Sequence, residues 1–169
     1  KLLGLDTKVE NVAKTPEDVV FCRSQMVFTP KGWMLIKRPM DAFKTMCGVM
    51  RHFKGTQLLD YFFTMNVGYK KLWDGVPVMG ALSEIFGDQG KFDAKLLSGD
   101  EFYKLRGCSR VTPHLQIRPE HRNSFAMTFG IPVASQIRIE RLCGEVGEGM
   151  PERLISFASA RRNCEIIEC

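Results

Sequence analysis

Few residues of this 169-residue chain have the types and spacing that metal binding or triad chemistry requires. The six cysteines form no Cys-x-x-Cys pair, and no cysteine–histidine set has the spacing of a zinc finger. The three histidines, His52, His114 and His121, have no spacing typical of a catalytic triad or a ligand set. The sequence therefore predicts no metal site and no histidine-based triad.

A second set of side chains is suited to contacting a nucleic-acid backbone. Arg23 and Ser24 lie in one apolar run, and Lys37 and Arg38 end the next, where their donors could reach sugar and phosphate oxygens. Trp33 and Arg38 also offer planes on which a base could stack. The alternative for Trp33 is a place in the hydrophobic core, because tryptophan is mostly buried. We expect these side chains to bind a nucleic acid without selecting its base sequence.

The elements that must position these side chains are two strands. Residues 19–28 and 33–38 are rich in β-branched and aromatic residues, and the link between them contains Pro30, Lys31 and Gly32. Two such runs around a short turn predict an antiparallel β-hairpin. Phe21, Val27 and Ile36 would anchor this hairpin on a core.

The rest of the chain shows helical periodicity. Apolar residues recur every three to four positions, and proline, glycine or Asp-Gly pairs mark the ends. The expected helices span residues 39–55, 58–73, 76–87, 119–129 and 131–144. The stretch Ser98-Gly99-Asp100-Glu101 has the form of a capping box, which predicts a further helix start.

Composition is that of a globular chain with a modest positive charge. Hydrophobic residues make up 44%, which is enough for a core, and no apolar run approaches the length of about 20 residues that crosses a bilayer. The formal net charge of +5 permits a polyanionic partner without requiring one. The start, Lys1-Leu2-Leu3-Gly4, has neither an initiator Met nor a signal-peptide pattern, so we expect a piece of a longer chain. Nothing favours secretion, and reduced thiols are expected.

Three motifs in order resemble the polymerases of tombusvirus-like positive-strand RNA viruses. Phe21-Cys22-Arg23-Ser24, a short turn and then Gly32-Trp33 through Arg38 resemble the primer-grip hairpin between palm and thumb. Residues 72–78, Leu-Trp-Asp-Gly-Val-Pro-Val, resemble a thumb element in which glycine usually stands at Asp74. Residues 118–125 followed by Phe129-Gly130-Ile131 resemble a segment near the end of the same thumb. Residues 4–10 resemble, more weakly, the stretch before the hairpin.

The resemblance implies an α+β fragment of a right-hand RNA-dependent RNA polymerase. Residues 1–38 would be the end of the palm with the primer-grip hairpin, and residues 39–169 a mainly helical thumb. Such a fragment would position the primer or nascent RNA while a positive-strand genome is copied. The alternative, from another class, is a non-enzymatic helical module that binds RNA or protein.

The chemistry that the resemblance implies is nucleotidyl transfer with carboxylate-held Mg²⁺ or Mn²⁺. The metal-binding aspartates would lie upstream, so this fragment would bind no metal and would be inactive alone. The stretch of residues 98–101 only superficially echoes a Gly-Asp-Asp turn and is better explained as a helix cap. The resemblance also suggests a lysine before the hairpin as general acid, either Lys8 or its competitor Lys14, although both could be solvated surface lysines.

The implied partners are template and nascent RNA, nucleoside triphosphates, and the upstream fingers and palm of the same protein. No membrane span is expected in this chain. The expected location is the host cytoplasm, at viral replication complexes.

Overall fold

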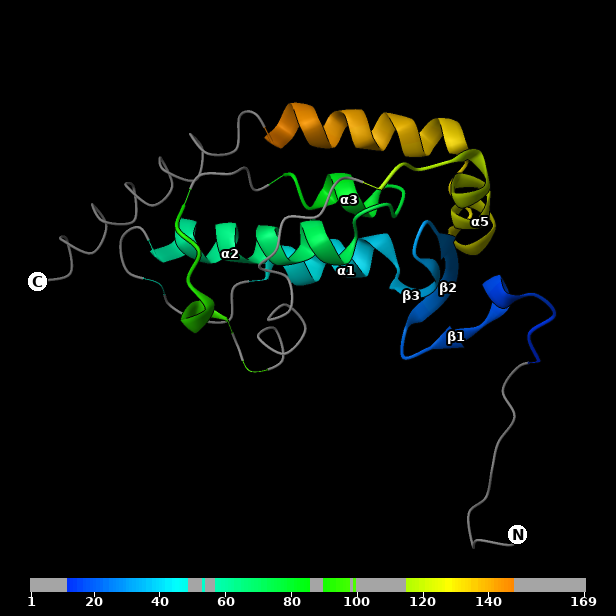
Figure 1. Ribbon diagram of the computed structural model, residues 1–169, viewed down its shortest axis with the longest axis horizontal. Coiled ribbons are helices and arrows are strands. Elements are labelled where there is room, and N and C mark those ends of the chain that lie inside the picture. Colours follow the sequence, from blue (N-terminus) through cyan, green and yellow to red (C-terminus); the bar gives the residue numbers. More distant parts are fainter. Residues whose placement is uncertain are drawn as a thin grey trace, which may run out of the picture.

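The computed structural model describes residues 12–48, 53, 57–85, 90–97, 99 and 115–147. Its architecture is α+β, with a small antiparallel sheet followed by helices, as predicted (Figure 1). The sheet contains β1 (Val20–Phe21), β2 (Ser24–Thr29) and β3 (Gly32–Lys37) in that order, after the short 3-10 helix η1 (Pro16–Asp18).

The predicted hairpin is confirmed by β2 and β3. Their register pairs Thr29 with Gly32 and runs to Ser24 opposite Lys37. The first apolar run is nevertheless not one strand, because the chain turns back at Cys22 and Arg23, which have φ angles of 50° and 62°. Positive φ at both central residues is the geometry of a two-residue turn that matches the twist of its flanking strands. Cysteine and arginine are not typical there, so the sequence did not reveal this turn.

The helices follow the predicted order with different lengths. They are α1 (Pro39–Cys47), α2 (Gln57–Leu72), α3 (Met79–Leu82), the 3-10 helix η2 (Ala94–Leu96), α5 (Pro119–Phe129) and an unlabelled helix over residues 133–147. We refer to the last of these as the 133–147 helix. No helix within the described ranges is long and apolar enough to cross a membrane.

Two predicted helices were too long. The helix expected to reach Gly55 ends at Cys47, because Gly48 has extended backbone angles. The helix expected over residues 76–87 is limited to α3 within the described part of that range, since Pro77 and Val78 lie in a turn before it and residues 83–85 in a turn after it; residues 86 and 87 lie outside the described residues. By contrast, α5 ends at Phe129 as predicted, with Gly130 in the left-handed conformation that glycine adopts easily. The capping box predicted at Ser98 lies outside the described residues.

The core joins the inner face of the hairpin to the helices. Val27 and Ile36 from the sheet, Met46 from α1, Met65 from α2 and Phe125 from α5 are almost completely buried. Figure 1 shows α5 beside β2 and β3 at one end of the molecule, with the 133–147 helix passing over α3. The hairpin is therefore packed against segments about 100 residues later in the chain.

Candidate functional site

The two faces of the β2–β3 hairpin differ in their exposure. Strand residues alternate between faces, and cross-strand partners share a face. Val27 and Ile36 face the core, whereas Ser24 and its partner Lys37, with Phe28 and its partner Trp33, share the opposite face. We call that opposite face the outer face of the hairpin; it also carries Met26 and Leu35.

Trp33 is not a core residue. Its side chain is 44% exposed, and its ring lies 5.3 Å from the ring of Phe28, centroid to centroid, with the planes tilted by 52°. The expectation that Phe21 anchors the hairpin is wrong, because Phe21 is 63% exposed on the two-residue strand β1. The outer face is thus aromatic at one end and cationic at the other, where Lys37 is exposed.

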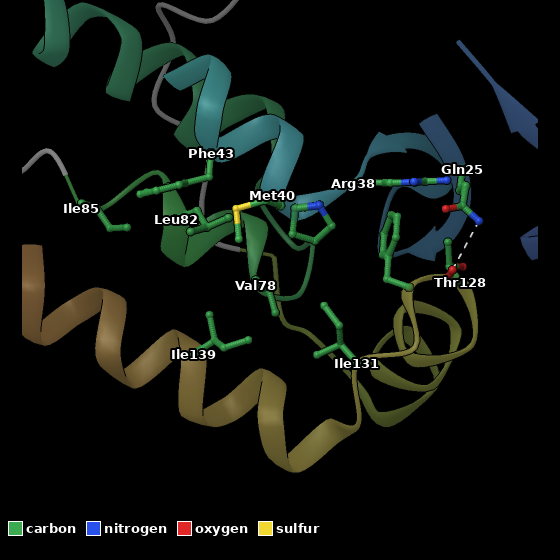
Figure 2. Close-up of a pocket in the computed structure, with 12 residues that line it drawn as sticks. Gln25, Arg38, Met40, Phe43, Val78, Leu82, Ile85, Thr128, Ile131 and Ile139 are labelled. Carbon is green, nitrogen blue, oxygen red and sulfur yellow. Dashed lines mark hydrogen bonds between the residues drawn. The ribbon is translucent and has the colours of Figure 1, made fainter. Parts of the chain in front are cut away.

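The structure separates Arg38 from the other candidate binding residues. Arg38 has the same parity as Ile36 and precedes α1, so it lies toward the inner side of the hairpin. There it lines a groove of about 690 Å³, in which Figure 2 shows it beside Gln25 at one end. The remaining groove residues are apolar except for Thr128: Pro39, Met40, Phe43, Val78, Leu82, Ile85, Phe129, Ile131 and Ile139.

The remaining candidates are scattered. Arg23 is exposed in the turn next to Ser24, so it lies near the outer face. Lys14 is exposed before η1, and its backbone amide donates to the Asp18 carboxylate at 3.3 Å. Lys8 lies outside the described residues. The proposed general-acid role of either lysine stays a prediction.

Side chains of α5 cover the edge of β2 that β1 leaves open. The backbone amide of Phe28 donates to Ser124 Oγ at 2.9 Å, and Thr128 Oγ1 donates to the carbonyl of Met26 at 2.9 Å. Gln25 Nε2 donates to the carbonyl of Thr128 at 3.3 Å, the hydrogen bond drawn in Figure 2. Exposed strand edges tend to pair with other chains, so this covering also protects the sheet.

Asp74 and Gly75 of the 72–78 motif each have a structural role. Asp74 Oδ1 accepts a hydrogen bond from the amide of Leu115 at 3.1 Å. Gly75 has φ +78°, and a Cβ there would lie 3.0 Å from both Leu115 Cβ and Pro30 Cγ in the hairpin turn. The same turn reaches α2, because Lys31 Nζ donates to the carbonyl of Lys71 at 2.9 Å. The hairpin turn thus packs against Gly75 of this motif and is hydrogen-bonded to the end of α2.

Val78 has a strained backbone. Its φ of 65° and ψ of −46°, with the Met79 amide 2.6 Å from the Pro77 carbonyl, make a positive-φ γ-turn. Such turns are rare, and a positive φ is particularly unfavourable for a β-branched residue. A residue in this state costs roughly 1–3 kcal/mol and persists only where the surroundings hold it.

The group that holds Val78 is Glu140 on the 133–147 helix. Glu140 Oε1 accepts from the Val78 amide at 2.9 Å, and both carboxylate oxygens accept from the Arg122 guanidinium of α5 at 2.9 Å. The Arg122 and Glu140 side chains are only 19% and 21% exposed. Arg122 is therefore a largely buried partner of Glu140 that links α5 to the 133–147 helix.

Two further side chains of this region, Cys143 and His121, are buried. Burial raises the pKa of the Cys143 thiol, and the carboxylates of Glu140 and Glu84 raise it further. His121 is 5% exposed, and its Nδ1 accepts the backbone amide of Arg118 at 3.0 Å, which satisfies a free amide at the start of α5. Its ring packs on Phe28 at 5.5 Å between centroids. His121 is thus a capping residue beside the outer face.

No three Asp, Glu, His or Cys side chains gather into a set that could hold a metal ion anywhere in the described ranges. The donor set within these ranges therefore does not fit the pair of ions that nucleotidyl transfer uses.

Sequence reasoning missed several residues that build this region. Gln25, Ser124 and Thr128 fix the strand edge, and Glu140 joins α5 to the Val78 turn. The hydrogen bonds that they make to β2, to the Thr128 carbonyl and to Val78 span 62 to 103 residues of the chain. No local spacing could have revealed these pairs, although Ser124 lies in one of the recognised motifs.

Comparison with known proteins gives one family. The family model described as viral RNA-dependent RNA polymerase matches residues 1–146. The chain is similar to the RNA-directed RNA polymerase of Pothos latent virus (isolate Pigeonpea/India), with 26% identity over 140 residues, covering 82% of this chain and 18% of that protein. It is also similar to the RNA-directed RNA polymerase of Groundnut rosette virus (strain MC1), with 25% identity over 172 aligned residues, covering 99% and 20%. The chain thus spans about a fifth of the length of these relatives, and no solved structure matches it.

Proposed function

This chain belongs to the viral RNA-dependent RNA polymerase family, and on that premise we propose that it is the part of such an enzyme that holds RNA beside the catalytic centre. The proposal includes the activity of the whole protein, which would be RNA-directed synthesis of RNA from nucleoside triphosphates. Family membership does not favour the alternative of a non-enzymatic module.

The observation that carries the proposal is the composition of the outer face. It places the cation of Lys37 and the hydroxyl of Ser24 at one end and the exposed ring of Trp33 at the other. Lys37 and Trp33 are four residues apart in β3, or about 13 Å at the usual strand rise. A cation for a phosphate and an aromatic plane for a base are the two contacts that single-stranded RNA uses without sequence choice.

Lys37 and Arg38 would contact RNA from different sides. Consecutive residues at a strand end point to opposite faces. Lys37 therefore lies on the outer face, whereas Arg38 lines the groove. A strand held by both cations would cross the end of β3, where that strand passes into α1. Arg23, exposed at the neighbouring turn, would add a third positive charge on the outer side.

Polymerases of this family use divalent metal ions. We propose Mg²⁺ or Mn²⁺, held by aspartates in a preceding palm segment of the same protein. The carboxylates within the described ranges do not fit these ions, so no step of the reaction is assigned to them. The metal, when bound, would lower the barrier by neutralising triphosphate charge and activating the attacking hydroxyl.

Three further parts of the proposal rest on the family alone. A lysine before the hairpin, Lys8 or Lys14, would donate a proton to the departing pyrophosphate. The preceding fingers and palm would pack with this chain as partners. The enzyme would work in the host cytoplasm at viral replication complexes.

The experiment uses the full-length polymerase that contains this chain. Lys37→Gln should raise the apparent Kd for a primer–template and lower the magnitude of the slope of log K against log salt by about 0.7–0.9, the value for one lost phosphate contact. Lys95→Gln, which removes an exposed lysine of η2, is the matched control and should change neither quantity. Equal effects of the two variants, or an unchanged salt slope with Lys37→Gln, would overturn the RNA-holding role.

A further inference from the structure

The strained turn at Val78 must be restrained by groups outside the turn itself. The turn has a positive φ that a valine adopts only under constraint. Its own hydrogen bond spans only Pro77 to Met79. The Val78 side chain is 2% exposed, so it is fixed by packing as well.

Glu140 restrains the backbone of this turn through a hydrogen bond from the Val78 amide. One of its oxygens, Oε1, accepts from both the Val78 amide and the Arg122 guanidinium, while Oε2 accepts from Arg122 alone. Three hydrogen bonds of 2.9 Å meet on one carboxylate that is about one-fifth exposed. Charge-assisted bidentate pairs of this kind fix direction as well as distance.

Arg122 carries this restraint into α5. The backbone carbonyl of Arg122 accepts from Gln136 Nε2 at 2.9 Å, so the 133–147 helix grips α5 at a second point. Ser124 and Thr128 of the same helix bind the edge of β2. An unbroken series of hydrogen bonds and rigid elements therefore links the Val78 turn to the hairpin.

We propose that Glu140 is a positioning residue whose carboxylate locks the Val78 turn and α5 into one arrangement, and thereby fixes the hairpin that holds RNA. The proposal rests on the proposed function for its RNA readout only. It assigns a role to two of the recognised motifs, residues 72–78 and 118–125, because Glu140 is the group that joins them.

The chain offers a matched control on the same helix. Arg141 Nε lies 3.5 Å from Glu145 Oε1, but these side chains are 70% and 59% exposed. This ion pair has the same chemistry and touches no strained turn. Exposed pairs contribute little, so Glu145→Ala should leave both folding and RNA binding unchanged.

The test is a double-mutant cycle in the full-length polymerase. Glu140→Ala should lower the melting temperature and raise the primer–template Kd by about 2- to 30-fold. The KM for nucleoside triphosphate should stay unchanged, because the proposal places Glu140 away from that substrate. Glu140→Gln, which keeps the size of the side chain, is the milder variant to use if Glu140→Ala does not fold.

The deciding variant is Val78→Gly, because glycine adopts positive φ without a hold. If Glu140 holds the strained turn, its substitution should have a smaller effect in the Val78→Gly protein than in the parent protein. The fall in melting temperature and the rise in log Kd should both be less than half as large. An equal cost in both backgrounds overturns the proposal, and so does a Glu145→Ala effect as large as that of Glu140→Ala.

Failure of the RNA-holding role would be visible separately. In that case Lys37→Gln would leave the Kd unchanged, while the coupling between Glu140 and Val78 would still appear in the melting temperatures. If the positioning role alone is wrong, Lys37→Gln would weaken binding and the coupling would be absent.

Discussion

Ser124 Oγ accepts a hydrogen bond from the backbone amide of Phe28 at 2.9 Å and donates one to Glu17 Oε1 at 3.0 Å. One buried hydroxyl thus joins η1, β2 and α5. The amide of Phe28 would otherwise face the open edge of the sheet, where a missing partner costs stability.

We expect Ser124→Ala to destabilise this junction by about 1–3 kcal/mol, because the Phe28 amide and the Glu17 carboxylate would both lose a partner. Hydrogen exchange in the full-length polymerase should show faster exchange in the peptide that covers β2. Asn123→Ala, at the exposed neighbouring position of α5, is the control. Unchanged exchange in β2 would contradict the role of Ser124.

Ile36 and Phe21 should respond oppositely to truncation. Ile36 is 2% exposed and Phe21 63%. Ile36→Ala should therefore lower the free energy of unfolding by about 2–5 kcal/mol, whereas Phe21→Ala should stay within about 0.5 kcal/mol. Thermal or denaturant unfolding of both variants checks this, and similar losses would show that β1 is buried in the working enzyme.

Two glycines of neighbouring elements make a matched pair. Gly75→Ala should destabilise by roughly 1–3 kcal/mol, since φ is +78° and the added Cβ would press on Leu115 and Pro30. Gly80 lies in α3, where a Cβ would make only ordinary contact, 3.5 Å from the Trp73 carbonyl. Gly80→Ala should be neutral or stabilising by up to about 1 kcal/mol. Equal effects in unfolding experiments would disprove the close approach at Gly75.

Asp18 should contribute a pH-dependent stability. Hydrogen bonds from Thr15, chiefly from its backbone amide, hold the pKa of this carboxyl below its ordinary value of 3.8. A lowered folded-state pKa means that the ionised form stabilises the fold. That contribution is complete above pH 3.8 and is lost as the pH falls through the lower folded-state value.

Asp18→Asn should therefore flatten the acid end of the stability curve and leave its pH dependence above that window unchanged. Unfolding measured across the acid range checks the prediction. Parallel curves for the two proteins at every pH would contradict it.

The hairpin and the order of the helices could be predicted because their signals are local. Two runs rich in β-branched and aromatic residues on either side of Pro30 to Gly32 predicted β2 and β3, and Pro119 with Gly130 bounded α5 correctly. Local signals failed where tertiary contacts override them. The Cys22–Arg23 turn has no typical turn residue, and Val78 adopts its angles because Glu140 and core packing hold it.

The candidate site was predicted in part. Ser24, Trp33 and Lys37 share one face as their alternation in the strands allows, whereas Arg38 follows the opposite parity into the groove. Periodicity states which residues share a face but not which face meets the core. Glu140 was beyond prediction, because its partners Val78 and Arg122 lie 62 and 18 residues away.

The covering of β2 by α5 has a consequence for synthesis on the ribosome. Phe28 and Ser124 are 96 residues apart, and translation at about 5–20 residues per second separates their appearance by roughly 5–20 s. A strand edge that has emerged can pair with another nascent chain in that interval. Polymerase chains translated close together from one message are therefore exposed to mispairing until α5 emerges, and a slower ribosome lengthens that exposure.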